Sequence, residues 1–184
     1  MGTPSHIRRF SAVGWDVYRV NIPPSHANHD NAGWYSRSRL YAELALLNVT
    51  KLRAQGYQRI ALAGYSGGAM GALFAGTLTS SIDAVFAMAP CCGVNPNGPY
   101  VKVGGFYDLL VDFKAPRLMI FFFSGERNAP GDIGSRSTAI LGKKDVVYRV
   151  YDEPEGFHGH TAGLTAEFAK TFSDEIISFA AGEE

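Results

Sequence analysis

The chain has 184 residues, with 17 lysines plus arginines and 17 aspartates plus glutamates, so its formal net charge is zero. Hydrophobic residues make up 46% and charged residues 18%, a balance typical of a folded globular protein and not of a disordered one. Without an excess of basic residues, neither a nucleic acid nor an anionic membrane is expected as a partner. The length predicts a single domain over residues 1–184.

The amino-terminal stretch MGTPSHIRRFSAVGW lacks the apolar core of a secretory signal. No run approaches the roughly eighteen apolar residues that a membrane span needs. We therefore expect a cytoplasmic protein. The two cysteines, Cys91 and Cys92, are adjacent, and neighbouring cysteines rarely bridge each other because the geometry is strained, so no disulfide framework is predicted.

Five β-rich apolar runs alternate with longer helical patterns. The predicted strands are Trp15–Asn21, Arg59–Gly64, Asp83–Ala89, Arg117–Ser124 and Asp145–Tyr151. Continuous apolar runs such as LMIFFF are typical of strands covered on both faces, as in a parallel sheet. Strands that alternate with helices favour right-handed crossovers, so we predict an α/β fold with a doubly wound, mostly parallel sheet of about five to six strands.

Three helices are predicted, over residues 38–56, 67–80 and 161–182. The first places Leu40, Leu44, Leu47 and Leu52 near helical spacing and ends at Gly56, a residue type that often terminates helices. The irregular segment from Cys91 to Pro116 predicts a small cap or pocket-lining segment with one short helix. Its aromatic residues form either an apolar pocket wall or local core: Tyr100, Phe106, Tyr107 and Phe113.

The second predicted strand runs directly into the sequence Gly64-Tyr65-Ser66-Gly67-Gly68, which fits the pattern G-x-S-x-G between a strand and a helix. This spacing has a steric reason, because a serine in such a sharp turn needs neighbours nearly free of side chains for the strand and the helix to pack. The turn would lift the Ser66 hydroxyl above the sheet, and the Gly67 amide at the helix start could stabilise an oxyanion. Ser66 is therefore a candidate nucleophile. The alternative is a glycine-rich turn without a catalytic role.

A serine needs a base, and the last predicted strand runs into the histidine-containing sequence DEPEGFHGHTAG. His158 is the first choice for the base and His160 the second. The orienting acid is expected in the loop after the fourth strand, which reads GERNAPGDIG and offers Glu126, Asn128 and Asp132.

On these segments the chain resembles the α/β-hydrolase superfamily, in the region of dienelactone hydrolases and small serine esterases, from about Phe10 to Ala180. The matching stretches are FSAVGWDVYRVNIP, the elbow ALAGYSGGAMGAL, the acid-loop strand FFFSGERN and the histidine loop PEGFHGH. The order serine, acid, histidine is the order of that superfamily. The resemblance implies a three-layer sandwich, a small-molecule ester or acyl substrate, and no cofactor or metal.

Two features depart from the superfamily pattern. Its acid commonly stands three residues after the glycine that ends the strand, which here is Asn128, so the charged Asp132 becomes the first choice, ahead of Glu126. The superfamily also has an earlier strand, whose loop supplies the second oxyanion donor, and near that position this chain offers only Gly2 or Thr3. The resemblance places that strand between the first and second strands predicted here, so its absence would leave a gap. Three explanations stay open: the chain is truncated at its amino terminus, another segment or subunit fills the gap, or the sheet is rearranged to five strands.

The sequence thus predicts a serine hydrolase in which Ser66 attacks an acyl carbon, His158 transfers the proton, Asp132 orients the imidazole and Gly67 binds the oxyanion. The alternative is a catalytically inactive relative that binds a small molecule or a partner. A flavodoxin-like nucleotide binder is disfavoured because no phosphate-cradling loop follows the first strand. His26, His29 and Asp30 lie in one short polar loop that predicts no metal site, and the number of copies in an assembly stays open.

Overall fold

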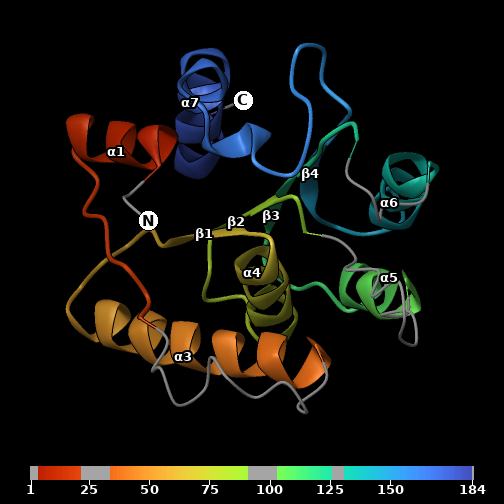
Figure 1. Ribbon diagram of the computed structural model, residues 1–184. Coiled ribbons are helices and arrows are strands. Elements are labelled where there is room, and N and C mark those ends of the chain that lie inside the picture. The colour runs from red at the N-terminus through yellow and green to blue at the C-terminus, as the bar shows by residue number, and fades with distance from the viewer. Residues whose placement is uncertain (1–3, 22–33, 91–102, 126–130, 184) are drawn as a thin grey trace.

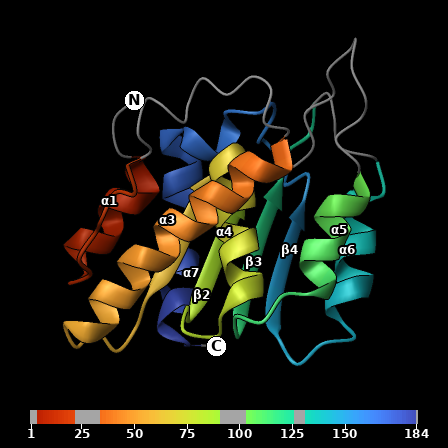
Figure 2. The same cartoon turned by 90° about the horizontal axis from the view of Figure 1, so that it is seen from below.

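The computed structural model describes residues 4–21, 34–90, 103–125 and 131–183. Its centre is a parallel sheet of four strands in the order β1-β2-β3-β4. The strands are β1 (Ala61–Tyr65), β2 (Ala84–Met88), β3 (Arg117–Phe122) and β4 (Val147–Asp152). Their carboxyl ends all meet at one edge of the sheet (Figure 2). The described part of the chain therefore has fewer strands than the five to six predicted.

Helices cover both faces of this sheet (Figure 1). One face carries α1 (Ser5–Ala12) and α7 (Ala166–Ala181), and the other carries α3 (Trp34–Ala54), α4 (Gly67–Leu78), α5 (Val103–Val111) and α6 (Ile133–Leu141). A short 3₁₀ turn, η1 (Ala162–Leu164), precedes α7. The arrangement is the predicted doubly wound, three-layer sandwich, although the sequence patterns missed α1 and α6.

The core follows from the alternation of side chains along the buried strands. In β3, Leu118, Ile120 and Phe122 face α4 and α5, whereas Met119 and Phe121 face α7. All five residues of β2 are buried, as expected for a strand covered on both faces. Aromatic packing continues into α7, where the Phe168 and Phe172 rings lie 5.0 and 5.1 Å from the ring of Phe121.

Helix α3 ends as predicted, because Gly56 follows it with a φ of +93°, a left-handed conformation that suits glycine. The leucines at helical spacing are buried only in part: Leu40, Leu44 and Leu52 are half-buried and Leu47 is exposed. The fully buried positions of α3 are Ser38, Ala42, Ala45 and Val49. Helices α3 and α4 pack closely. A Cβ added at Gly71 of α4 would lie 2.6 Å from the Cβ of Tyr41, so this contact requires glycine at position 71.

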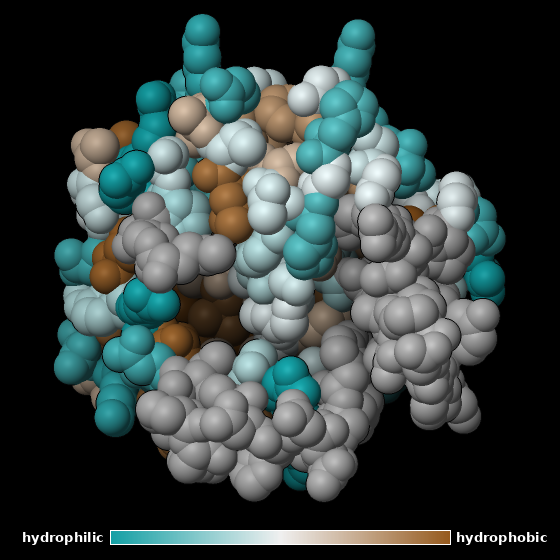
Figure 3. Space-filling view, viewed as in Figure 1, coloured by the Kyte–Doolittle hydropathy of each residue, from teal (hydrophilic) through white to brown (hydrophobic). Residues whose placement is uncertain are grey.

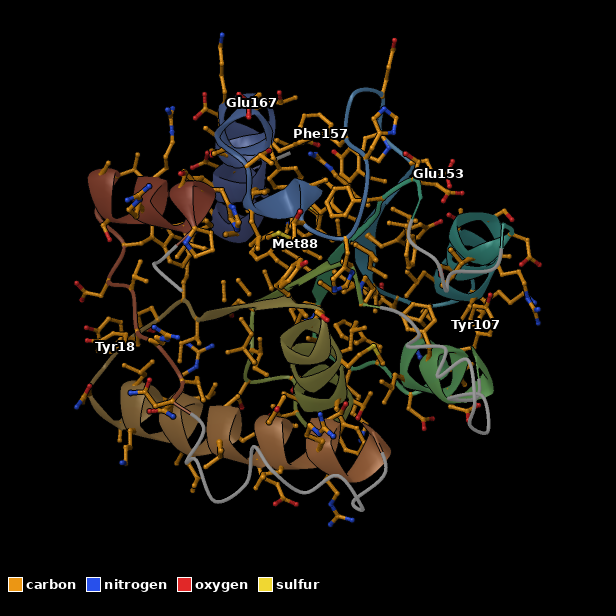
Figure 4. All side chains as sticks on the ribbon, viewed as in Figure 1. Tyr18, Met88, Tyr107, Glu153, Phe157 and Glu167 are labelled. Atoms are coloured by element: carbon orange, nitrogen blue, oxygen red, sulfur yellow. The ribbon has the colours of Figure 1, made fainter. Side chains whose placement is uncertain are left out.

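The described part of the predicted cap belongs to the main core. Phe106, Tyr107 and Phe113 are buried, and the Phe113 ring fills the space in front of Gly76 of α4. Tyr107 lies between α5 and α6 (Figure 4), with the Arg136 guanidinium 4.6 Å from its ring centre. Tyr100 and the two cysteines fall outside the described residues.

The first predicted strand, Trp15–Asn21, is not a strand in the structure. The segment is tied down by side chains: the Tyr57 hydroxyl donates to Asp16 at 2.5 Å, and the hydroxyls of Tyr18 and Tyr57 lie 2.7 Å apart. The Trp15 amide bonds back to Phe10. A β-rich segment becomes a strand only when a neighbour pairs with its backbone, and no described segment does so here.

One buried histidine in α1 makes stability depend on pH. His6 is 2% exposed, and burial lowers its pKa from 6.5 to about 4. Between these values the unfolded chain binds more protons than the folded one. We therefore expect the free energy of unfolding to fall as the pH is lowered through this window, by about 3 kcal/mol at pH ~4.

Urea titrations at pH ~7 and ~4.5 check this expectation, with His6→Leu as the control that removes this titration and keeps an apolar side chain. A pH dependence of equal size in both proteins would contradict it.

Candidate active site

The candidate site lies at the carboxyl edge of the sheet, and the backbone there is unusual at every strand end. Ser66 after β1, Ala89 after β2 and Glu153 after β4 are the non-glycine residues of positive φ in the described chain, and Gly125 after β3 also has positive φ. Non-glycine residues in this conformation are strained, and such strain concentrates at functional sites. Each turn therefore presents its residue at the same edge of the sheet.

Ser66 stands between β1 and α4 with φ 54° and ψ −121°. Its amide donates to the carbonyl of Met88 at 2.9 Å, so the sheet continues through the turn. Within the described residues its hydroxyl has no hydrogen-bond partner and is partly exposed. This is the strand-turn-helix geometry that the sequence predicted around Ser66.

Gly64 explains why this turn can be so sharp. A Cβ at Gly64 would lie 2.2 Å from the Gly68 carbonyl oxygen and 2.6 Å from the Ala69 nitrogen, both backbone atoms. A Cβ at Gly68 would meet nothing within 4 Å. The expectation that both positions need glycine for strand–helix packing is therefore correct for Gly64 and wrong for Gly68.

Gly67 opens α4, and its amide is one of the first-turn N–H groups that a helix leaves without an internal acceptor. Ser66 precedes it as the N-cap residue but gives no side-chain cap bond. The Gly67 amide therefore remains available at the helix start, where the helix dipole also favours negative charge.

The histidine loop crosses back from β4 over the edge of the sheet. Ser124 and His158 form an isolated parallel bridge, and the Gly159 amide donates to the Ser124 carbonyl at 2.7 Å. The Tyr65 hydroxyl donates to the carbonyl of His160 at 2.5 Å, and the two rings lie 5.0 Å apart. The loop thus reaches the residue next to Ser66.

His158 is held by a residue that the sequence analysis did not single out. The Nδ1 of His158 and the Oγ of Ser124 form a short hydrogen bond, while Nε2 has no partner within the described residues. The sequence feature that points to Ser124 is its position at the carboxyl end of a predicted strand, because the side chains at the carboxyl ends of parallel strands meet at one edge of the sheet. The structure shows no hydrogen bond from Ser66 to either His158 or His160.

The structure shows no hydrogen bond or ion pair between Asp132 and His158. Asp132 precedes α6 as its N-cap residue, and its carboxylate lies 3.9 Å from the Arg136 guanidinium one turn later. Glu126 and Asn128, the other candidates for the orienting residue, lie outside the described residues, as do Gly2, Thr3, His26, His29 and Asp30.

At the end of β4, burial raises the pKa of Asp152, and the neighbouring Glu153 raises it further.

Comparisons with known proteins bear on the fold. No model of a protein family and no curated protein sequence matches the chain. The solved structures that match include a Klebsiella pneumoniae subsp. pneumoniae protein named as a dienelactone hydrolase (TM-score 0.56, 16% identity) and a CIB-like hydrolase from Thermoplasma acidophilum (TM-score 0.59, 14% identity). The fold is the α/β-hydrolase fold.

The matched regions cover 79% and 93% of this chain. They span 61% of the Klebsiella protein and 76% of the Thermoplasma protein. The resemblance to α/β-hydrolases that the sequence indicated is confirmed for the fold. At these identities the likeness concerns the fold alone, so the chemistry rests on the residues of this α/β-hydrolase-like chain itself.

In the described residues no group of three or more histidine, cysteine, aspartate or glutamate side chains is placed to hold a metal ion. None of the described helices is both long enough and apolar enough to cross a membrane.

Proposed function

We propose that this protein is a serine hydrolase that cleaves an ester or a similarly activated acyl bond in a small molecule. The observation that carries the proposal is the backbone of Ser66, with φ 54° and ψ −121° between β1 and α4. Strain of this kind costs about 1–3 kcal/mol and is retained where it positions a reactive group. The hydroxyl that this turn presents has no structural partner in the described chain.

The chemistry follows from the groups around the turn. Ser66 Oγ attacks the acyl carbon while His158 Nε2 accepts its proton, and the Gly67 amide binds the oxygen that becomes negative. His158 then returns the proton to the leaving alcohol, which departs and leaves an acyl-serine. A water molecule, deprotonated by the same imidazole, attacks the acyl-serine. The bond to Ser66 Oγ breaks, the imidazole returns its proton to Oγ, and the acid leaves.

Ser124 supports this assignment of His158. A base that acts through Nε2 needs its proton on Nδ1, and the Ser124 hydroxyl oxygen can accept that Nδ1–H. In this proposal Ser124 orients the imidazole, the role for which the sequence suggested Asp132. The charged neighbour of Asp132 is Arg136. That Asp132 orients the imidazole stays a prediction, and the variants of Ser124 and Asp132 below test which of the two residues does so.

The nucleophile is tested with a fluorophosphonate probe, which labels activated serines covalently. Labelling of the wild type and none of Ser66→Ala would support the proposal. A second assay follows release of p-nitrophenol from short-chain p-nitrophenyl esters. Equal labelling of both proteins, or no turnover by the folded wild type, would favour the alternative, an inactive relative that binds a small molecule.

Ser124→Ala is expected to lower kcat on these esters by about tenfold or more and to leave KM nearly unchanged, because the imidazole loses its tautomer and orientation. Ser124→Thr keeps the hydroxyl and should recover most of the rate. Asp132→Asn, the matched control, is expected to change kcat by less than about twofold, since exposed ion pairs one helix turn apart contribute little. A larger loss of kcat in Asp132→Asn than in Ser124→Ala would assign the orienting role to Asp132.

A further inference from the structure

In the described part of the chain, no strand pairs with the outer edge of β1. The Ser66 amide donates to Met88 of β2, and the Ile60 carbonyl accepts from Asp83, so the even-numbered residues of β1 face β2. Because backbone groups of a strand alternate in direction, the N–H and C=O groups of Ala61 and Ala63 point away from β2. Ala63 is exposed, although every residue of β2 is buried. Within the described residues, β1 is thus an edge strand whose outer backbone groups face no other strand.

A long hollow runs beside this edge. One cavity of about 410 Å³ lies along β1, and a second of about 460 Å³ continues toward the amino end of the strand. Both are lined by Ala61 and Leu62 on one side and by Trp15, Asp16, Tyr18 and Val20 on the other. Figure 3 shows the opening, with an apolar floor. We call this hollow the β1 slot.

Helices already cover both faces of the β1 slot. His6, Ile7 and Phe10 of α1 line it on one face, and Tyr41 and Ala45 of α3 line it on the other. Helix α1 packs most extensively against α7, and α3 against α4, so neither takes its main support from a strand. In a three-layer sandwich, helices on both faces imply a strand between them. The described residues place none there.

The far wall of the β1 slot is the segment that the sequence predicted as a strand. Among the described residues, Asp16, Val17, Tyr18 and Val20 have no backbone–backbone hydrogen bond. Tyr18 stands on this wall, away from the sheet (Figure 4). The side-chain bonds to Tyr57 hold the wall in place. An element between the two walls could pair with both, which would turn the segment into the strand that its β-rich sequence favours.

We propose that the β1 slot binds one extended, apolar peptide segment of a partner polypeptide as an added β-strand. A strand is slim, offers backbone donors and acceptors on both sides, and rises about 3.3 Å per residue, which suits a hollow that follows the whole of β1. Two copies that paired β1 with β1 would each have to pass the wall of Trp15, Asp16, Tyr18 and Val20 that lines this hollow, which a single extended segment need not do. A compact apolar molecule would leave the free backbone groups unpaired. This inference does not depend on the proposed function.

The test is hydrogen exchange of individual amides, measured by NMR with the full chain. The probe is a heptapeptide of alternating valine and threonine with a solubilising lysine at each end. At saturating peptide, exchange of the Ala61 and Ala63 amides should slow by about tenfold or more. Alternate amides of the far wall, such as those of Tyr18 and Val20, should also become protected, because only every second residue of a strand faces the added one. The Leu62 amide faces β2 and is the internal reference, with little change expected.

A peptide with the same side chains but N-methylated at alternate residues is the matched control, because it lacks donors along one edge. It should give no protection. Equal effects of both peptides, without protection of Ala63, would mean an apolar ligand pocket and would overturn the proposal. Protection that rises with protein concentration alone, together with dimer formation in light scattering, would assign the β1 slot to a second copy.

Weak affinity of the free peptide could by itself give a negative result. The same heptapeptide is therefore also fused to the amino terminus through a flexible glycine–serine linker, which raises its local concentration. The amino terminus is a suitable attachment point because Pro4 lines the β1 slot. If neither the free nor the fused strand protects Ala61 and Ala63, the proposal is wrong.

Discussion

Gly64→Ala is expected to lower the free energy of unfolding by more than about 3 kcal/mol, enough to unfold many domains. The new Cβ would lie 2.2 Å from the carbonyl oxygen of Gly68 and 2.4 Å from its carbonyl carbon. These are backbone atoms of the first turn of α4, so the clash is relieved only by moving the helix away from β1. Urea titration followed by circular dichroism measures the change.

Gly68→Ala is the matched control in the same turn. Its Cβ meets nothing within 4 Å, and its φ is not in the left-handed region, so we expect a change of less than about 1 kcal/mol. Similar stabilities of the two variants would contradict the close approach of strand and helix at Gly64. Because Gly68 also lines the β1 slot, its alanine variant should be kept out of the peptide experiment.

Ser66→Gly is expected to separate stability from activity. Glycine adopts a φ of 54° with ψ −121° without the steric cost that serine has, so the free energy of unfolding should rise by about 1 kcal/mol or more. Ester turnover should fall by about a thousandfold or more, because the nucleophile is gone.

Ser66→Ala distinguishes the two effects. Alanine keeps the Cβ and hence the backbone strain, so this variant should be equally inactive and close to the wild type in stability. Thermal unfolding and p-nitrophenyl ester hydrolysis, measured on the same preparations, give both quantities. A Ser66→Gly protein no more stable than Ser66→Ala would show that the turn is not strained, and full turnover by either variant would exclude Ser66 as the nucleophile.

The elements that the sequence predicted well are those whose physical cause is local. The run LMIFFF predicts a buried strand by itself, and β3 covers Arg117–Phe122 within the predicted range. A strand that leads straight into a glycine-flanked serine and then a helix predicts the elbow, because that turn depends on residues adjacent in the chain. The elbow at Ser66 and the end of α3 near Gly56 therefore follow from the sequence alone.

The predictions that failed depend on contacts between distant segments. Trp15–Asn21 has the composition of a strand, but a strand needs a partner, and its neighbour on the sheet side is the β1 slot. The leucines of α3 have helical spacing, but Leu47 is exposed, and the fully buried face of the helix is the one that meets α4 through contacts such as Tyr41 with Gly71. Strand pairing and the choice of the buried helix face depend on residues far apart in the chain, so the periodicity of one segment does not predict them.

For the candidate site, the sequence alone determined which residue types stand at the carboxyl ends of the strands: a serine after one, histidines after another, and carboxylates between them in the chain. Only the tertiary structure decided which of them meet. It brought Ser124 to His158 and the histidine loop to Tyr65, and it left Asp132 beside Arg136. The reason is physical: strand order and the path of each loop are set by packing across the whole sheet, whereas a motif records only neighbours along the chain.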